Sequence, residues 1–115
     1  MPTTFHLTPC DQWEAQREIR TYAPPSLSDE GFIHCTDGEE NVIAVGNRYY
    51  AADPREMVCL IIDVGTVTSE IRYEDPARIY PHIYGKLNVD AVIGVRSVIR
   101  GEHGEFLRLG PPVGS

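Results

Sequence analysis

Short apolar runs separated by turn-forming residues divide the chain into expected strands and two helices. Both helices fall in the first half, over residues 9–18 and 37–50. The first is expected to begin where Thr8 caps the turn and Pro9 occupies the first helical position. The second is expected to begin at Thr36-Asp37-Gly38-Glu39, because this order of residues matches the capping box that opens many helices.

The expected strands outnumber the helices and do not alternate regularly with them. Residues 57–62 are continuously apolar, which is typical of a central strand covered on both faces. Residues 91–100 predict a long strand, and Gly101-Glu102-His103-Gly104 predicts the turn of a hairpin. Shorter strands are expected at residues 5–7, 19–22, 31–35, 69–74 and 105–109, whereas residues 75–87 are expected to be irregular.

This pattern predicts an α+β fold with a mixed or antiparallel sheet and two helices in the N-terminal half. A length of 115 residues is that of one domain. We expect this domain to span residues 1–110. Residues 111–115, which are mostly Gly and Pro, are expected to be a flexible tail.

Composition indicates a cytoplasmic protein. No apolar run approaches the roughly 20 residues that a membrane helix needs, and the N-terminus has neither a basic region nor an apolar signal core. The three cysteines are odd in number and form no CxxC pair. We therefore expect free thiols in a reducing compartment, and no membrane partner.

The charge narrows the class of ligand. A net charge of −7 argues against duplex nucleic acid as a partner, because neutralisation of phosphates dominates that affinity. Apart from Lys86, all the basic residues are arginines. Arginine binds a phosphate or carboxylate with two parallel hydrogen bonds, so a local group of arginines can hold a small anionic ligand. The alternative is that these arginines form surface ion pairs that contribute little.

Two segments place imidazoles next to turns. In Gly31-Phe32-Ile33-His34-Cys35-Thr36 an apolar run ends at His34, which can bind a sugar hydroxyl or transfer a proton near neutral pH. In Tyr80-Pro81-His82-Ile83-Tyr84-Gly85 the proline stiffens the backbone beside His82, and the tyrosines offer flat faces to a heterocycle. The alternative is structural: both histidines anchor loops, and the tyrosines are packing residues.

Four further residues, Arg48, Tyr49, Arg72 and Glu74, are candidates for the same site. A guanidinium can bind a phosphate, and Glu74 can act as an acid–base group or hold a ribose hydroxyl. The alternative for Arg72 and Glu74 is an ion pair on one face of a strand. For Arg48 the alternative is a cation placed at the C-terminal end of a helix dipole.

Other chemistries lack support in the sequence. The signature motifs of dinucleotide, nucleoside-triphosphate, zinc-protease and serine-hydrolase sites do not occur. The spacing of His6, His34, Cys35 and His82 does not favour a metal site, and none is expected. Cys35 and His34 are a conceivable nucleophile and base, but adjacent strand residues point to opposite faces.

Taken in order, the segments G-F-I-H-C-T, N-R-Y-Y, R-Y-E and Y-P-H-I-Y-G-x-L resemble the small bacterial and plant proteins grouped as domain-of-unknown-function family 952. The resemblance extends from Phe5 to Phe106. It implies a fold similar to that of the ADP-ribosyltransferases, a small split α+β sheet that holds NAD between two half-sheets. The family itself has no assigned activity to carry over.

The likeness to ADP-ribosyltransferases implies a role for each residue type. His34 would hold the ribose, a tyrosine would pack on the nicotinamide, an arginine would pair with the pyrophosphate, and a glutamate would stabilise developing positive charge. Glu74 and Glu105 are the available glutamates, and neither stands in a diagnostic motif. The expected catalytic residues are His34, Glu74 and His82, and the expected binding residues are His34, Arg48, Tyr49, Arg72 and Tyr84.

Two functions remain open. The first is an enzyme or former enzyme that binds NAD or a related nucleotide, with NAD as a possible substrate and no required cofactor. The second is a non-catalytic domain that binds a small metabolite in the same cleft. Both require the imidazoles of His34 and His82 to face one shared hollow. The sequence indicates no oligomeric state.

Overall fold

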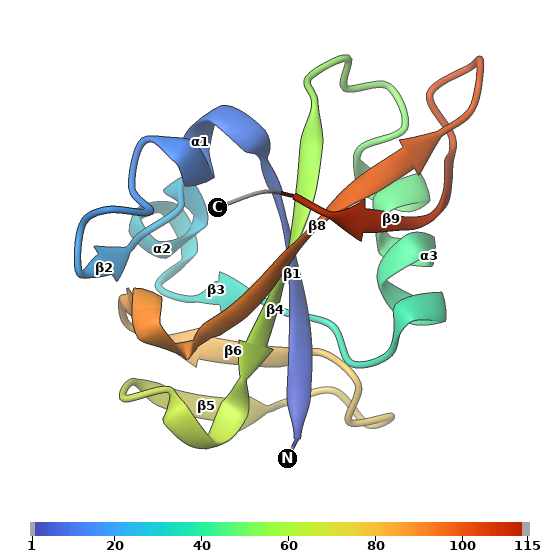
Figure 1. The fold of residues 1–115 in the computed structure, drawn as a ribbon. Helices are drawn as coiled ribbons and strands as arrows, with labels where there is room; N and C mark the ends of the chain where they lie inside the picture. Colours follow the sequence, from blue (N-terminus) through green and yellow to red (C-terminus); the bar gives the residue numbers. More distant parts are fainter. Residues whose placement is uncertain (1, 114–115) are drawn as a thin grey trace.

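The computed structural model describes residues 2–113, which form antiparallel sheets surrounded by helices (Figure 1). The largest sheet has the strand order β1-β4-β8-β9, the second has the order β3-β6-β5, and the third pairs β2 with β7. In chain order the elements are β1 (Thr3–Pro9), α1 (Cys10–Glu14), β2 (Thr21–Tyr22), α2 (Pro25–Glu30), β3 (Ile33–His34), α3 (Glu39–Tyr49), β4 (Met57–Asp63), η1 (Val64–Thr66), β5 (Glu70–Tyr73), β6 (Pro81–Tyr84), β7 (Leu87–Asn88), η2 (Val89–Ala91), β8 (Val92–Arg100) and β9 (Phe106–Pro112). Within the described residues, no helix has the length and apolar character needed to cross a membrane.

Strand β4 is central, as its apolar sequence predicted. It pairs with β1 on one side and β8 on the other, both antiparallel. Successive side chains of a strand point to opposite faces. Val58, Leu60 and Ile62 accordingly enter one buried cluster, whereas Met57 and Cys59 enter another. Burial of each side chain of this size stabilises the fold by roughly 1.5–3 kcal/mol. Strand β4 therefore stabilises both cores.

The smaller core lies between the large sheet and α3. Val42 and Gly46 are the buried positions of this helix, and they face β1 and β9. Gly46 packs so closely on the buried Phe106 ring that an added Cβ atom would lie 2.3 Å from Phe106 Cδ2. The glycine therefore sets the distance between the helix and β9.

Both predicted helix starts were wrong in their capping residue. Thr8 is buried in β1, and α1 begins after Pro9 without a side-chain cap. Thr36 exchanges backbone hydrogen bonds with Phe5, from Thr36 N to Phe5 O at 2.8 Å and from Phe5 N to Thr36 O at 2.9 Å. Because the backbone of Thr36 is paired with β1, α3 begins later in the chain. Its N-cap is Gly38, with φ of 90°.

Two elements escaped the sequence pattern. No helix was expected after the strand at residues 19–22, but Pro25 begins α2, where proline fits because the first helical N–H needs no partner. Pro81 begins β6 inside the region expected to be irregular, and the first position of a strand tolerates proline. The described chain thus has three α-helices instead of two.

The C-terminal strand is longer than expected. Strand β9 continues through Pro112, and Val113 N donates to Val95 O at 2.8 Å. The first residues of the expected tail, 111 and 112, therefore belong to the sheet. Gly114 and Ser115 lie outside the described residues.

Replacement of Gly46 by alanine tests the close approach of α3 and β9. Alanine normally stabilises a helix by about 1 kcal/mol relative to glycine. At this position the new methyl group would overpack Phe106, which typically costs about 1–3 kcal/mol. We expect Gly46→Ala to lower the free energy of unfolding by about 1 kcal/mol in urea denaturation, the net of these two effects. Ala44→Gly, at an exposed position of the same helix, measures the difference in helix propensity alone. A Gly46→Ala variant that is more stable than the wild type would contradict the close packing of Gly46 on Phe106.

Candidate functional site

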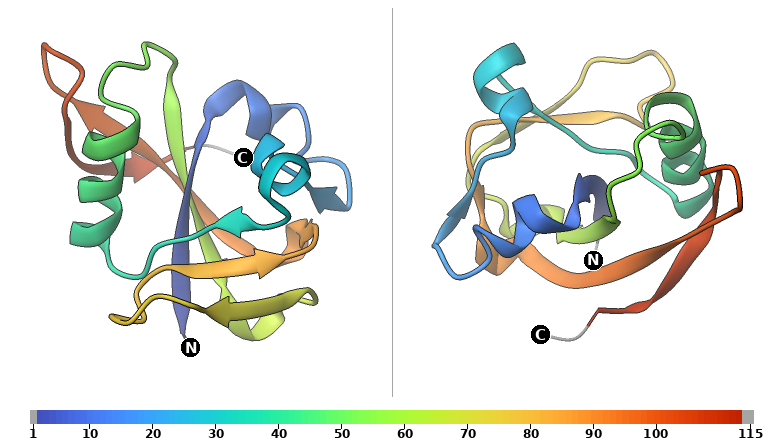
Figure 2. Two further views of the ribbon diagram at one scale, coloured as in Figure 1. Left: turned by 180° about the vertical axis from the view of Figure 1, so that it is seen from behind. Right: turned by 90° about the horizontal axis from the view of Figure 1, so that it is seen from above.

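A cleft of about 850 Å³ lies where β1, α2, α3 and the segment after β3 come together. In the view from behind, α2 and α3 lie on the two sides of β1, and β3 crosses below them (Figure 2). Both His34 and His82 line this cleft. The two imidazoles that the sequence singled out thus face one shared hollow.

The two histidines are directly opposite each other on paired strands. Antiparallel pairing of β3 with β6 places Ile33 across from Ile83 and His34 across from His82. The imidazole centroids are 5.4 Å apart, with the rings nearly perpendicular. Because side chains alternate, the isoleucines point into the core with no exposed surface, and the histidines point outward.

Each imidazole has one nitrogen bonded to a glutamate and the other nitrogen free. His34 Nε2 lies 2.8 Å from Glu30 Oε2, and His82 Nδ1 lies 3.2 Å from Glu74 Oε1. Among the described residues, His34 Nδ1 and His82 Nε2 have no hydrogen-bond partner. A carboxylate accepts a hydrogen, so the bonded nitrogens carry the N–H and the free nitrogens can accept from a ligand hydroxyl. The arrangement can bind a sugar hydroxyl or take up its proton.

Phe32 supports the histidine pair from the same face of the sheet. Its ring stacks on His82 with centroids 4.0 Å apart and an interplanar angle of 16°. It also meets His34 edge-on at 4.8 Å. These contacts limit the rotation of both imidazoles.

Cys35 cannot join this pair. It is buried on the opposite face of the strand, and burial raises the pKa of its thiol far above neutral. Among residues 2–113, no three His, Cys, Asp or Glu side chains are placed to hold a metal ion together.

A third histidine, His6, lies beneath His34 in the floor of the cleft. Its Nδ1 donates to the backbone carbonyl of His34 at 2.6 Å, and its Nε2 lies 3.0 Å from the Tyr22 hydroxyl. That hydroxyl is 2.8 Å from Thr8 Oγ1, and Thr8 also lines the cleft. Burial lowers the pKa of His6 to about 4, so the ring is neutral at pH 7 and holds the end of β3 through one N–H.

The other expected site residues divide into two groups. Arg48 and Tyr49, at the end of α3, line the cleft together with the histidines. Arg72, Glu74 and Tyr84 lie beside it on the outer face of the β3-β6-β5 sheet and do not line it.

Within the second group, the ion pair of Arg72 with Glu74 that the sequence offered as an alternative is not formed. Arg72 instead binds Glu70 at 2.9 Å, and its guanidinium stacks over the Tyr84 ring at 4.5 Å. Glu74 accepts hydrogen bonds from the Tyr84 hydroxyl and from His82, and the first of these is the main reason why its pKa is lowered. Glu74 therefore acts on the cleft only through His82.

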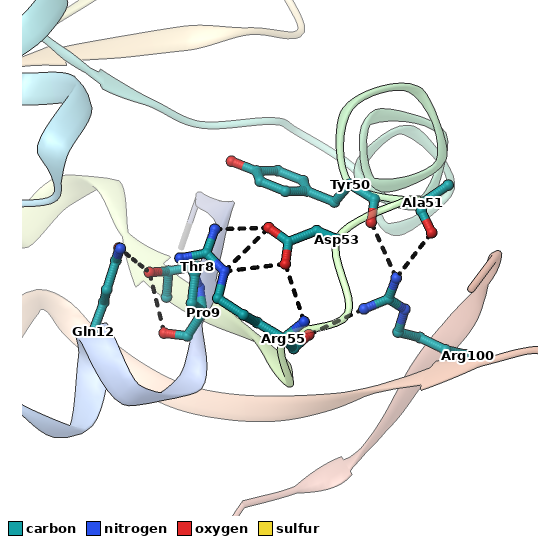
Figure 3. Close-up of polar contacts among 8 residues, drawn as sticks. All are labelled: Thr8, Pro9, Gln12, Tyr50, Ala51, Asp53, Arg55 and Arg100. Atoms are coloured by element: carbon teal, nitrogen blue, oxygen red, sulfur yellow. Dashed lines mark hydrogen bonds and ion pairs between the residues drawn. The ribbon is translucent and has the colours of Figure 1, made fainter.

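Sequence reasoning missed several lining residues. Glu30 orients His34, and Tyr50 and Arg55 add an aromatic and a cationic group. Tyr80, whose ring the sequence analysis had offered to a heterocycle, also lines the cleft. In Asp53-Pro54-Arg55, an Asp two residues before an Arg is a local signal for a paired guanidinium. Figure 3 shows this end of the cleft, with Asp53 against Arg55.

The fold and the cleft define a small α+β domain built from antiparallel sheets, with a ligand-sized hollow beside a cross-strand histidine pair. Residues 7–95 match the family described as "Protein of unknown function (DUF952)". The match covers more than half of the chain, so the protein belongs to this family, as the four sequence motifs indicated.

Three solved structures of one bacterial protein have a similar fold. The crystal structure of CC0527 from Caulobacter crescentus is 18% identical, covers 91% of this chain and 93% of that chain, and has a TM-score of 0.75. The crystal structure of a double mutant of CC0527 gives the same values. The solution NMR structure of CC0527 has a TM-score of 0.70 at 18% identity and 90% coverage of both chains. No curated protein matches the sequence.

These similarities establish the family and the fold. Neither the family description nor the names of the structures mention ADP-ribosyl transfer or NAD. The expected likeness to the ADP-ribosyltransferase fold therefore has no support from these structures.

The buried His6 predicts a loss of stability on mild acidification. Its folded pKa of about 4 lies below the ordinary value of 6.5, so the unfolded chain binds more protons as the pH falls from 6.5 towards 4. The free energy of unfolding should drop by about 2 kcal/mol between pH 7 and pH 5 from this group alone. Urea denaturation at several pH values measures the slope.

Two substitutions test whether His6 causes this dependence of stability on pH. His6→Gln should flatten it even if the variant is less stable at pH 7, because the group that titrates has been removed. His103→Gln, in the exposed β8–β9 turn, should leave it unchanged. An unaltered slope in His6→Gln would mean that other groups cause the acid sensitivity.

Proposed function

We propose that the cleft binds a nucleotide-type ligand, with NAD and ADP-ribose as the first ligands to test. The observation that carries this proposal is the His34–His82 pair, whose rings are 5.4 Å apart at a cleft wall and keep one free nitrogen each. Free imidazole nitrogens beside each other suit the adjacent hydroxyls of a ribose. The likeness to ADP-ribosyltransferases that the sequence motifs imply adds NAD as the specific nucleotide.

The size and the aromatic lining of the cleft support such a ligand. Small-molecule sites usually measure roughly 300–1,000 Å³, and a volume of about 850 Å³ accommodates a nucleotide. Tyr49 and Tyr80 line the cleft with relative exposures of 66% and 36%. Their exposed rings are available to stack on a base or on nicotinamide.

As an enzyme, the protein would break the bond between nicotinamide and the ribose of NAD. The bonding electrons would leave with nicotinamide, and the ribose would pass through an oxocarbenium-like state before an acceptor attacks. His34 would hold the ribose hydroxyls, and a stacked tyrosine would orient the leaving group. A carboxylate facing the ribose would stabilise the positive charge.

One observation favours the second candidate, a binding domain without catalysis. Glu74 is bonded to the histidine pair through His82, and it is engaged by Tyr84 and His82 instead of lining the cleft. Binding needs only the histidines, the arginines and the aromatic rings. Transfer would need a carboxylate placed where Glu74 is not.

Thermal-shift titration separates these functions. Ligand at a hundredfold excess over its dissociation constant should stabilise the protein by roughly 2.7 kcal/mol. We expect NAD or ADP-ribose to raise the melting temperature of the wild type, and His34→Ala and His82→Ala to lose most of this rise. Release of nicotinamide from NAD would support the enzyme, and a shift without release would support the binding domain.

His103→Ala is the matched control, because His103 is exposed and distant in sequence from both strands. It should respond to ligand like the wild type. If neither nucleotide shifts the wild type, or if His34→Ala retains the full shift, nucleotide binding at this pair is wrong.

A further inference from the structure

We propose that Arg55, together with Arg48, forms a phosphate-binding subsite on the α3 side of the same cleft. A ligand of this protein would then carry a phosphate or pyrophosphate in addition to the part that the histidines hold. The inference deepens the proposed function, and it rests on that function only for the nucleoside part. The phosphate part stands on Arg55 and its surroundings.

The backbone that carries Arg55 is fixed by Arg100 from β8. Arg100 Nη2 donates to Tyr50 O at 3.0 Å and to Ala51 O at 3.3 Å, and Arg100 Nη1 donates to Arg55 O at 3.1 Å (Figure 3). Its Nε donates to Gly104 O at 3.0 Å. Three of these four hydrogen bonds hold the loop between α3 and β4, and that loop presents Arg55 in one place.

The Arg55 side chain is itself held in one orientation by Asp53. Arg55 Nε lies 3.0 Å from Asp53 Oδ1, and Nη2 lies 2.7 Å from Oδ2. These hydrogen bonds lower the pKa of Asp53 to about 2, so the carboxylate stays charged and continues to hold the Arg55 side chain. Arg55 Nη1 has no partner among the described residues. A guanidinium held on one edge can offer its other edge to an anion without losing further side-chain freedom.

Among the described residues, the cleft has one lining arginine without an ion pair, Arg48, despite the acidic chain. Of the acidic side chains that line it, Glu30 is bonded to His34, and Asp75 accepts from the backbone N–H groups of Ile79 and Tyr80. Arg48 lies over the Tyr49 ring at 5.4 Å and forms no ion pair with a described residue. Because Asp53 balances the charge of Arg55, the positive charge on the α3 side of the cleft that no described ion pair compensates is that of Arg48.

Hydrogen-bond donors accompany these cations. The Tyr50 hydroxyl has no hydrogen-bond partner in residues 2–113 and lines the cleft beside Arg55. A phosphate has several acceptor oxygens and matches the planar fork of arginine, so two guanidinium groups and a phenol suit it better than they suit a neutral group. A carboxylate ligand would form paired hydrogen bonds with only one of the two guanidinium groups. The grouping of Arg48, Tyr50 and Arg55 thus favours a phosphate or pyrophosphate.

Inorganic pyrophosphate tests the subsite without a nucleoside. We expect saturable binding to the wild type by isothermal titration calorimetry, and at least tenfold weaker binding to Arg55→Gln and to Arg48→Gln. Arg55→Lys keeps the charge but not the fork, so it should recover only part of the loss. Arg108→Gln removes the same charge from an exposed position on β9 and should change the affinity less than twofold. Circular dichroism checks that each variant is folded.

A second pair of titrations separates this inference from the proposed function. Arg55→Gln should weaken ADP-ribose binding at least tenfold and leave adenosine binding unchanged, whereas His34→Ala should weaken both. If the wild type binds ADP-ribose but Arg55→Gln binds it equally well, the subsite is wrong and nucleotide binding stands. If pyrophosphate binds through Arg55 while no nucleotide binds, nucleotide binding is wrong and the subsite stands. Equal losses in Arg55→Gln and Arg108→Gln would overturn the subsite, because they would reflect net charge alone.

Discussion

The pairing of β3 with β6 is the constraint on which the cleft depends. It places two fully buried isoleucines, Ile33 and Ile83, opposite each other in the core. A slip of one residue in β3 would reverse the two faces of that strand, so that Ile33 would be exposed and His34 would be buried. Each isoleucine contributes roughly 1.5–3 kcal/mol by burial, so the core fixes the register. The position of His34 against His82 is a consequence of that register.

A strand as short as β3 needs support at both ends. Its first residue is anchored in the core, and its last is held from below by the hydrogen bond from His6 to the His34 carbonyl. Directly after it, Cys35 N donates to Pro81 O at 3.0 Å and Thr36 bridges to Phe5 in β1. The wall that carries the histidines is therefore tied to the large sheet. The other walls come from β1, α2, α3 and the loop after α3.

Sequence patterns predicted the parts of the fold that local chemistry determines. The continuous apolar run of β4 and the alternation of buried and outward residues at 32–35 are visible in the sequence, and the structure has both. Strand β6 was missed because four residues beginning with Pro81 have no independent strand signal, and only pairing with β3 and β5 makes them one. The expected capping box at Thr36 failed for a similar reason. Its backbone is paired with Phe5, a residue 31 positions away.

The candidate site, too, could be predicted from the sequence only where local motifs determine it. His34 and His82 stand in dense local motifs, and their meeting needed only one strand pairing. The roles of His6 and Arg55 depend on partners 28 and 45 residues away in the chain, the His34 carbonyl and Arg100. No local pattern reports such contacts. The sequence also could not tell that Arg72 would bind Glu70 instead of Glu74, because both glutamates lie two residues from it along the strand.

The position of Glu74 decides what the histidine pair can do chemically. One of its oxygens accepts from both Tyr84 and His82, and these bonds favour the charged carboxylate. A charged carboxylate bonded to Nδ1 fixes the tautomer of His82 and leaves Nε2 as the acceptor. His82 therefore presents Nε2 to the cleft, and Glu74 positions His82. Glu30 has the same relation to His34 through Nε2. Both glutamates bonded to the pair orient imidazoles, which is the chemistry of recognising hydroxyl groups and moving their protons. Stabilising a sugar cation directly would require one of them to leave its histidine.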